Sequence, residues 1–395
     1  MSPITLKSLL LLPVLTSLFS ETLSSPAPFP NQYVEHALKK RQSLNIVATT
    51  NTHANTIDWI GWIPIGSQGK LAKAPPLSPA LPQDPTKMAG RPVAELEMPG
   101  VQKGPAGTVP IPRLNTTYLA NVRQKQAPPK KSGVSKRQNS GSHWYVNSNM
   151  NVNNHGGNWV MSMFKAFVNN GADFSLLQAA VAYQSSAGLQ TAEAGWINYR
   201  NQVSQPHIFT YFTTDGYTGS GTNIGGWNQD VGGWVQVDST YFPGTGFSSI
   251  ATIGGAQYDM TMQWQLYQGN WWLLVIDRFI GYYPGTMFSA ATNGGASLAQ
   301  QSNLIAYYGE LAQSEGPVTT TDMGSGKFGE TGFGNSGYIH NMFYIDTNGN
   351  SQDYTATFGD SDSSKWDHRA FTSSGTSWGS YVYLGGPGAG GVTGG

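Results

Sequence analysis

The sequence predicts an all-β protein of antiparallel sheets, arranged as a sandwich or a barrel. From His143 onward, short apolar or alternating runs recur, and Gly, Asn, Asp and Ser separate them. No stretch in this region has the pattern of a helix of three turns. Many short strands with turn signals between them are typical of sandwiches and barrels.

The clearest element is a hairpin within residues 254–288. Apolar and polar residues alternate in its first strand, which predicts one buried face formed by Tyr258, Met260, Met262, Trp264 and Leu266. Residues 268–270 (Gln-Gly-Asn) supply the turn, and Trp272 belongs to the returning strand. In each of the pairs 271–272 (Trp-Trp) and 282–283 (Tyr-Tyr), we expect one ring to face the core and the other to face solvent or substrate.

Composition divides the chain into a leader (residues 1–137) and a body (residues 138–395). The leader holds 16 of the 22 Lys and Arg residues and 6 of the 22 Asp and Glu residues, so its formal charge is +10 and that of the body is −10. It also holds 18 of the 23 prolines. Such a segment buries little core of its own. We expect a propeptide over residues 26–137, one folded domain over 138–384 and a flexible Gly-rich tail over 385–395.

The N-terminus has the features of a secretory signal. Lys7 precedes an apolar run, residues 8–19, that has signal-peptide length and is too short to span a bilayer. We therefore expect a signal peptide over residues 1–25 and a secreted, extracellular monomer that binds neither membranes nor nucleic acid. The chain has no cysteine, so the body must be stable without disulfides.

Three features of the leader suggest processing and docking. The pair Lys136-Arg137 stands in Gly- and Ser-rich surroundings where the composition changes, which favours cleavage there by a secretory-pathway protease over a solvated charge run. Asn115 begins an N-glycosylation sequon, and a glycan there would be lost with the leader. Residues 56–64 are rich in aromatic and β-branched residues, and we expect a strand there that docks on the body.

Several standard catalytic motifs are absent. The chain has no Gly-x-Ser-x-Gly, no His-Glu-x-x-His, no Walker loop and no cysteine. Serine-hydrolase, zinc-peptidase, nucleotide-hydrolase and cysteine-protease functions therefore lack local sequence support. The histidines of the body are scattered, which favours core or surface positions over a catalytic triad. We expect no metal site and no cofactor.

Glutamate is scarce in the body, which has twelve aspartates but only four glutamates. Aspartate is favoured in turns, so its abundance has a structural explanation that glutamate lacks. Glu315 and Glu330 lie in polar loops and are expected at the surface. Strand parity places the other two on apolar or small-residue faces: Glu193 with Leu189, Thr191 and Ile197, and Glu310 with Leu304, Ala306 and Tyr308.

Two carboxyls on such faces are suited to acid–base chemistry. Desolvation raises the pKa of a carboxyl, and two neighbouring carboxyls share a proton. Such a pair can place a general base and a general acid on either side of a water molecule. The alternative for each glutamate is a solvated strand end.

Longer motifs stand in a characteristic order along residues 143–346: 192–196 (Ala-Glu-Ala-Gly-Trp), 207–217 (His-Ile-Phe-Thr-Tyr-Phe-Thr-Thr-Asp-Gly-Tyr), 257–259, 269–272, 280–284, 308–310, 323–328 and 332–334. In these motifs the body resembles the neprosin family of secreted glutamic peptidases. Residues 57–59 of the leader are similar to a segment of fungal members, so the resemblance is to a fungal-type member.

The resemblance implies a sandwich of two large antiparallel sheets, a precursor activated at acid pH, and cleavage after proline by a pair of glutamates. Matched motif by motif, that pair falls on Glu193 and Glu310, the residues that strand parity selects. Two departures bear on loop geometry and substrate preference. Gly and Asn occupy residues 219–227 where plant members have cysteines, and Ala306 stands where many members have a further acid.

These observations lead to the hypothesis of a secreted, acid-active glutamic endopeptidase, made as a zymogen, that acts on proline-containing proteins or peptides. Trp196, Trp272 and Tyr282 are candidates for a pocket that stacks on a proline ring, with core packing as the alternative for each. The 254–288 hairpin lies between the glutamates in sequence, so we expect it in the sheet that brings them together. The rival functions are a β-sandwich glycosidase with two carboxylates and a non-catalytic carbohydrate-binding sandwich.

Charge and proline content also suggest how the precursor is regulated. A leader of +10 on a body of −10 should be held by long-range attraction near neutral pH, and protonation of carboxylates should weaken that hold as the pH falls. A post-proline peptidase could digest a leader with 18 prolines and spare a body with 5.

Overall fold

The computed structural model describes most of the body and separate parts of the leader: residues 31–51, 59–77, 103–112, 114, 118–119, 122, 125–126, 143–186, 188–247, 249–313 and 318–391. The expected signal peptide, Asn115, Glu315 and the pair Lys136-Arg137 lie outside these residues. Among the residues that are described, no helix is long and apolar enough to cross a membrane.

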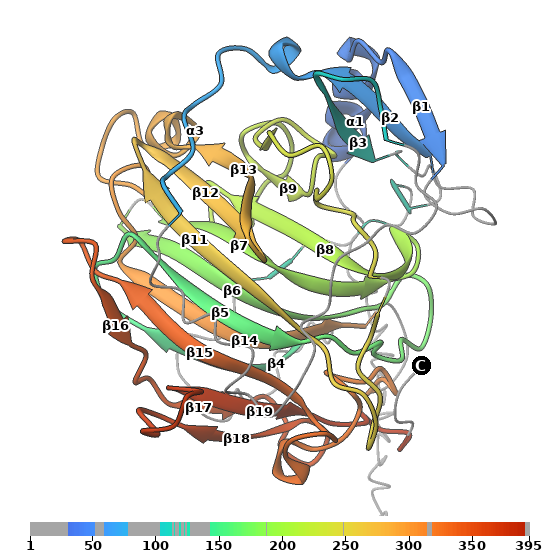
Figure 1. The fold of residues 1–395 in the computed structure, drawn as a ribbon, viewed down its shortest axis with the longest axis vertical. Coiled ribbons are helices and arrows are strands. Elements are labelled where there is room, and N and C mark those ends of the chain that lie inside the picture. The colour runs from blue at the N-terminus through green and yellow to red at the C-terminus, as the bar shows by residue number, and fades with distance from the viewer. Residues whose placement is uncertain are drawn as a thin grey trace, which may run out of the picture.

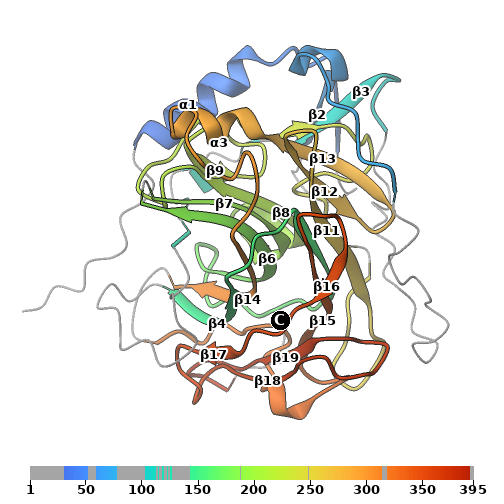
Figure 2. The same ribbon diagram turned by 90° about the vertical axis from the view of Figure 1, so that its left-hand side faces the viewer.

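Two large antiparallel sheets form a sandwich, as expected (Figures 1 and 2). The nine-stranded sheet runs in the order β10-β13-β12-β11-β5-β15-β19-β18, with β16 paired to β15, and the seven-stranded sheet runs β17-β4-β14-β6-β7-β8-β9. Large apolar side chains from both sheets, among them Trp159, Trp196 and Trp264, form one buried core. The core thus lies between the two sheets, as in other sandwiches.

The strands of the nine-stranded sheet are β5 (Gly156–Ser162), β10 (Val235–Gln236), β11 (Asp259–Tyr267), β12 (Asn270–Val275), β13 (Arg278–Pro284), β15 (Gly337–Ile345), β16 (Ser351–Asp353), β18 (Asp367–Phe371) and β19 (Tyr381–Gly385). The strands of the seven-stranded sheet are β4 (His143–Met150), β6 (Phe174–Ser185), β7 (Gly188–Tyr199), β8 (Val203–Thr213), β9 (Gly225–Trp227), β14 (Leu304–Ala312) and β17 (Phe358–Asp360). In the described part of the body, two short helical segments lie between strands, namely α3 (Gly285–Ala291) and η3 (Gly329–Thr331).

The predicted hairpin is confirmed as β11 and β12. Gln268 and Gly269 form its two-residue turn, and both have positive φ angles, 47° and 72°, which match the twist of paired strands. Trp271 packs in the core and its Nε1 donates a hydrogen bond to the Leu298 carbonyl at 2.7 Å. Trp272 faces the other way, into a separate cluster on the outside of the sheet. In the same way, Tyr283 packs in the core and Tyr282 lies in the outer cluster.

The expectation that this hairpin brings the two glutamates together is wrong. The hairpin belongs to the nine-stranded sheet, whereas Glu193 and Glu310 lie on β7 and β14 of the seven-stranded sheet. Nearness in sequence was misleading because the chain passes between sheets in a sandwich, so successive hairpins need not share a sheet.

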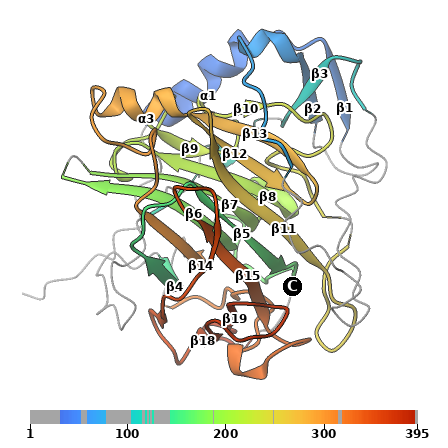
Figure 3. The same ribbon diagram turned by 60° about the vertical axis from the view of Figure 1, so that its left-hand side comes forward.

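The leader contributes regular structure of its own (Figure 3). It forms helix α1 (Asn31–Ser43), strands β1 (Ala48–Asn51), β2 (Trp59–Pro64) and β3 (Thr108–Pro112) in one sheet, and the 3-10 turn η1 (Ile65–Gln68). Tyr33 and Ala37, four residues apart, are both buried and give α1 an apolar side toward the body. In β2, Ile60 and Trp62 pack against Phe242 of the body. The expected docking strand is therefore confirmed for residues 59–64.

The glycine-rich C-terminus differs from the flexible tail that was expected. Gly385 ends β19, the Met323 N–H donates to the Gly386 carbonyl at 3.0 Å, and the Ala389 N–H donates to the Thr319 carbonyl at 2.9 Å. A Cβ atom on Gly386 would lie 2.1 Å from the Lys365 carbonyl oxygen. Glycine is needed there for close backbone approach rather than for mobility, so the expectation fails for residues 385–389.

Candidate active site

The register of three adjacent strands places the two glutamates on one face. In β6, Ala180 lies opposite Glu193 of β7, and Leu176 lies opposite Glu310 of β14. Directly opposed residues in an antiparallel pair point to the same side of the sheet, so both carboxyls project outward, away from the core that holds Trp196. Gln178 lies in the row between them, opposite Gly195, which has no side chain to occupy that space.

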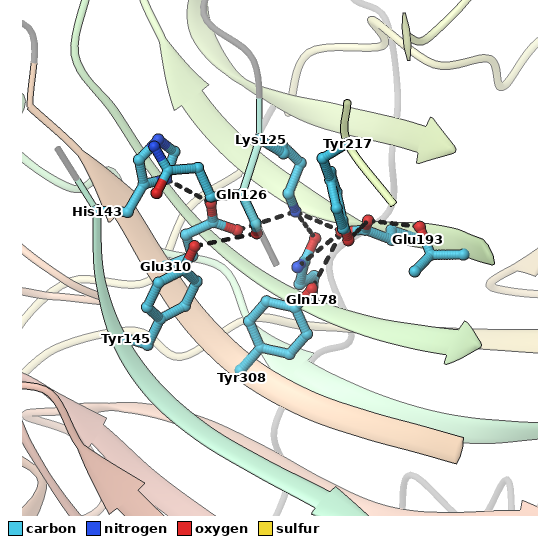
Figure 4. Close-up of polar contacts among 10 residues, drawn as sticks. Lys125, Gln126, His143, Tyr145, Gln178, Glu193, Tyr217, Tyr308 and Glu310 are labelled. Carbon is cyan, nitrogen blue, oxygen red and sulfur yellow. Dashed lines mark hydrogen bonds and ion pairs between the residues drawn. The ribbon is translucent and has the colours of Figure 1, made fainter. Parts of the chain in front are cut away.

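A lysine from the leader lies between the two carboxylates (Figure 4). The Lys125 Nζ atom is 2.6 Å from Glu193 Oε2 and 3.0 Å from Glu310 Oε2, and all three side chains are fully buried. It also donates a hydrogen bond to Gln178 Oε1 at 2.5 Å. The ammonium therefore lies closer to Glu193 than to Glu310.

Glu193 accepts hydrogen bonds from four uncharged donors. Its Oε1 atom accepts from the Tyr217 hydroxyl at 2.6 Å and the Thr191 hydroxyl at 2.8 Å. Its Oε2 atom accepts from the Tyr308 hydroxyl at 3.0 Å and the Gln178 amide at 3.1 Å. Burial raises the pKa of both tyrosines well above the ordinary value, which keeps their hydroxyls protonated as donors. Donors of this kind favour the ionised form of a carboxyl.

Glu310 has fewer partners. Its Oε1 atom lies 2.9 Å from Nδ1 of His143, the first residue of β4. Burial alone would raise the pKa of this carboxyl, but the Lys125 charge and the His143 contact outweigh burial and lower it. With Lys125 in place, Glu310 is therefore held as a carboxylate.

Aromatic rings surround the Lys125 ammonium. Its Nζ atom lies 5.3 Å from the ring centroid of Phe209 and 5.5 to 5.9 Å from those of Tyr308, Tyr211 and Trp227. These rings come from β14, which carries Glu310, from β8, which adjoins the Glu193 strand β7, and from β9, the next strand after β8. The next leader residue, Gln126, accepts a hydrogen bond on its carbonyl oxygen from the Tyr145 hydroxyl at 3.1 Å. The leader thus presents a cation and a backbone carbonyl to the glutamate pair.

The three aromatic residues expected to line a proline pocket lie elsewhere. Trp196 is completely buried between the sheets, where its Nε1 donates to the Ser162 carbonyl at 2.7 Å. Trp272 and Tyr282 lie on the outer surface of the other sheet. Parity explains the error for Trp196: it is an odd number of residues from Glu193, so it points to the opposite face. None of the three contacts the glutamates.

A model of the protein family described as Neprosin matches residues 171–387, more than half of the 395-residue chain. The chain belongs to the neprosin family. The matched region includes β6, β7, β8 and β14, and so contains Glu193, Gln178 and Glu310, whereas Lys125 lies outside it. The neprosin family is associated with peptidase activity, so proteins or peptides are the substrates to consider.

In this neprosin-family chain, the residues at the glutamate pair that escaped prediction from sequence include Lys125, His143, Tyr145, Gln178 and Tyr217. Gln178 had a usable signal, because it is a polar residue in the apolar run 176–182, on the parity that faces the glutamates. His143 and Tyr217 are near the glutamates only through strand pairing and a loop. Lys125 is one of sixteen basic residues in the leader, and nothing in its sequence surroundings distinguishes it.

Replacement of Trp196 should affect stability rather than catalysis. Trp196→Ala removes a fully buried indole and leaves a cavity, for which about 3 to 5 kcal/mol of unfolding free energy is expected to be lost. Trp196→Phe should lose less, because only the hydrogen bond to Ser162 and part of the volume disappear. Denaturant unfolding of the full chain measures both. A fall in peptide cleavage with unchanged unfolding would contradict the assignment of Trp196 to the core.

Proposed function

We propose that this chain is the latent precursor of a secreted, acid-active glutamic endopeptidase that cleaves on the C-terminal side of proline. The observation that carries the proposal is the convergence of two buried carboxylates, Glu193 and Glu310, on one position that Lys125 fills. The family match supports a peptidase. The proposal keeps the expected order of a signal peptide over residues 1–25, a propeptide over 26–137 and a catalytic domain from residue 138.

The position of Lys125 Nζ is where the nucleophilic water would bind after the leader leaves. One carboxylate takes a proton from this water as the oxygen attacks the scissile carbonyl carbon, and the partner carboxylic acid protonates the leaving amine. We assign the base to Glu193, because four uncharged donors remain on its carboxylate after Lys125 departs. Glu310 then loses the Lys125 charge that lowers its pKa, which suits it to the role of acid.

Two further groups have places in this mechanism. The Tyr145 hydroxyl, which donates to the Gln126 carbonyl in the precursor, is positioned to donate to the scissile carbonyl and to the oxyanion formed from it. Phe209, Tyr211 and Trp227 surround the Lys125 ammonium and would form an apolar wall for a proline ring. They replace Trp196, Trp272 and Tyr282 as the candidates for that wall.

Latency in this proposal has a local cause as well as a long-range one. Lys125 occupies the water position, so the leader blocks the chemistry directly, while the charges of +10 and −10 add general attraction. Both effects weaken as carboxylates are protonated. The leader is therefore an inhibitor in the precursor and a substrate once the body is active.

The test is cleavage of two matched fluorogenic peptides that differ only in having Pro or Ala before the scissile bond. The full chain is incubated at about pH 3 to 4, below the ordinary pKa of a carboxyl, and then assayed at that pH. We expect cleavage after proline, identified by the masses of the products, and a much slower reaction with alanine. No cleavage of either peptide, or release of reducing sugar from a glycan by the same preparation, would contradict the proposal.

A further inference from the structure

A second contact between leader and body lies on the side of the sandwich opposite to the glutamates. Four side chains of β12 and β13 form a cluster on the outer surface of the nine-stranded sheet, which we call the outer aromatic face: Trp272, Leu274, Phe279 and Tyr282. The ring centroids of Trp272 and Tyr282 are 4.4 Å apart. Figures 1 and 2 show the leader passing over these strands after η1. In this chain the outer aromatic face is therefore covered.

The covering segment is short, extended and rich in alanine and proline. Residues 70–77 read Lys-Leu-Ala-Lys-Ala-Pro-Pro-Leu, and residues 71–77 have neither helix nor strand. Ala72 and Ala74 pack against the outer aromatic face, and Pro75 is buried. The Ala72 N–H donates a hydrogen bond to the Tyr282 hydroxyl oxygen at 3.1 Å. The small alanine side chains of the leader thus lie on the aromatic rings, and the Ala72 N–H is the backbone group that the face binds through a hydrogen bond.

A glutamine fixes where this segment begins. The Gln68 Nε2 atom donates to the Gln236 carbonyl at 2.7 Å, and the Gln236 N–H donates to Gln68 Oε1 at 3.0 Å. Gln236 lies on β10, the strand at one end of the sheet order. The side-chain amide of Gln68 thus hydrogen-bonds the backbone of this edge strand, much as a neighbouring strand would. The leader thus reaches the outer aromatic face from the β10 edge of the sheet.

The chemistry of this face matches one known mode of peptide recognition. Extended proline-rich segments are preorganised and dock on surfaces lined by aromatic rings. Trp272 adds a donor to the surface: its Nε1 is buried and makes no hydrogen bond within the described part of the chain. A peptide carbonyl in the plane of the indole and next to Nε1 would accept a hydrogen bond from this N–H, which leader residues 70–77 leave unsatisfied.

We propose that the outer aromatic face is a binding site for an extended, alanine- and proline-rich segment of a protein substrate, which leader residues 70–77 occupy until the leader is removed. The inference rests on the proposed function, because it adds a substrate feature to the same peptidase. The leader contacts both outer surfaces of the sandwich, with 47 residues between Leu77 and Lys125. A substrate of similar length could engage both sites at once, which raises its effective concentration at the glutamates. Long proline-rich chains would then be preferred over short peptides.

The test measures binding rather than catalysis, in the full chain with Lys125 in place. Residues 70–77 are exchanged for a Gly/Ser segment of equal length, which frees the outer aromatic face while the glutamate pair stays blocked. A fluorescent peptide with the sequence of residues 70–77 is then titrated and its anisotropy is recorded. We expect saturable binding to the exchanged chain and none to the wild-type chain, whose own segment fills the face. Because no bond is cleaved, failure of the proposed peptidase function would leave this result unchanged.

Two variants locate the site. Tyr282→Phe in the exchanged chain removes the acceptor for the Ala72 N–H and should weaken binding by roughly tenfold, the effect of losing one hydrogen bond. A peptide in which both prolines are replaced by alanine should also bind more weakly. Equal binding to wild-type and exchanged chains, equal binding of the alanine peptide, or dimerisation of the exchanged chain in place of peptide binding would each overturn the proposal.

Discussion

Glu310→Gln and Glu193→Gln should each reduce cleavage of the proline peptide by about 10³-fold or more, since loss of general acid–base catalysis alone removes 10²- to 10⁴-fold. Glutamine has the shape of glutamate but can neither take the proton of the water nor give one to the leaving amine. Effects on residues that act as a unit are not additive, so the double variant should be hardly slower than either single one. Initial rates after acid treatment measure the loss.

Glu330→Gln is the matched control, because Glu330 is exposed in η3 and contacts neither Glu193 nor Glu310. It should have the wild-type rate. The Glu193→Gln chain should also fail to remove its own leader at about pH 3 to 4, yet the active enzyme should cut that leader when the two are mixed. Unchanged turnover in either glutamate variant, or maturation of Glu193→Gln at the wild-type rate, would rule out the dyad.

The glutamate pair could be found from the sequence because strand parity is a local property. A period of two assigns each side chain to a face without knowledge of the partner strands, and the faces of Glu193 and Glu310 were correct in this sense. The same reasoning identified the hairpin of β11 and β12, whose turn residues determine its register. Antiparallel sheets were expected for the same local reasons.

The missing information was which strands pair across long stretches of sequence. β6, which separates the two glutamates, adjoins β14 although about 120 residues lie between their paired positions, such as Ala182 and Leu304. Nothing in either strand specifies the other. The expectation that one ring of each Trp-Trp and Tyr-Tyr pair faces the core is confirmed, but the sequence could not tell that Trp272 and Tyr282 are the outer rings or which surface they face. Helix α1 was also missed, since most of its stabilisation comes from packing on the body rather than from local propensity.

Two carboxyls couple leader docking to pH in opposite directions. The pKa of Glu310 is lowered in the docked state, so its contribution to docking is present at higher pH and is lost as the pH falls through that lowered pKa. Burial beneath the leader raises the pKa of Asp230 to about 6, despite hydrogen bonds from Tyr33 and Tyr118. Protonation of Asp230 therefore favours docking as the pH falls from about 6 toward the ordinary carboxyl value of about 4. We therefore expect acid to release the leader only below that pH range, where Glu310 is the one of these two carboxyls that still changes its protonation state.

Lys125→Met should activate the precursor without acid treatment. Methionine fills a similar volume among the aromatic rings but leaves Glu193 and Glu310 buried together without a cation. Removal of one partner from a buried ion pair costs about 3 to 5 kcal/mol, which corresponds to a weakening of leader docking by about a hundredfold to several thousandfold. We expect the variant to cleave the proline peptide at once on transfer to assay pH, whereas the wild-type chain shows a lag while its leader is released.

Lys103→Met distinguishes this local block from general charge attraction. Lys103 is an exposed leader residue, so its replacement removes the same unit of charge from the +10 leader without touching the glutamates. The lag of this control should be close to that of the wild-type chain, because one exposed charge among many is largely screened by salt. Hydrogen exchange at residues 118–119, 122 and 125–126 should rise in Lys125→Met and stay unchanged in Lys103→Met. Equal shortening of the lag in both variants would mean that the overall charge of the leader, and not the position of Lys125 between the two carboxylates, keeps the precursor inactive.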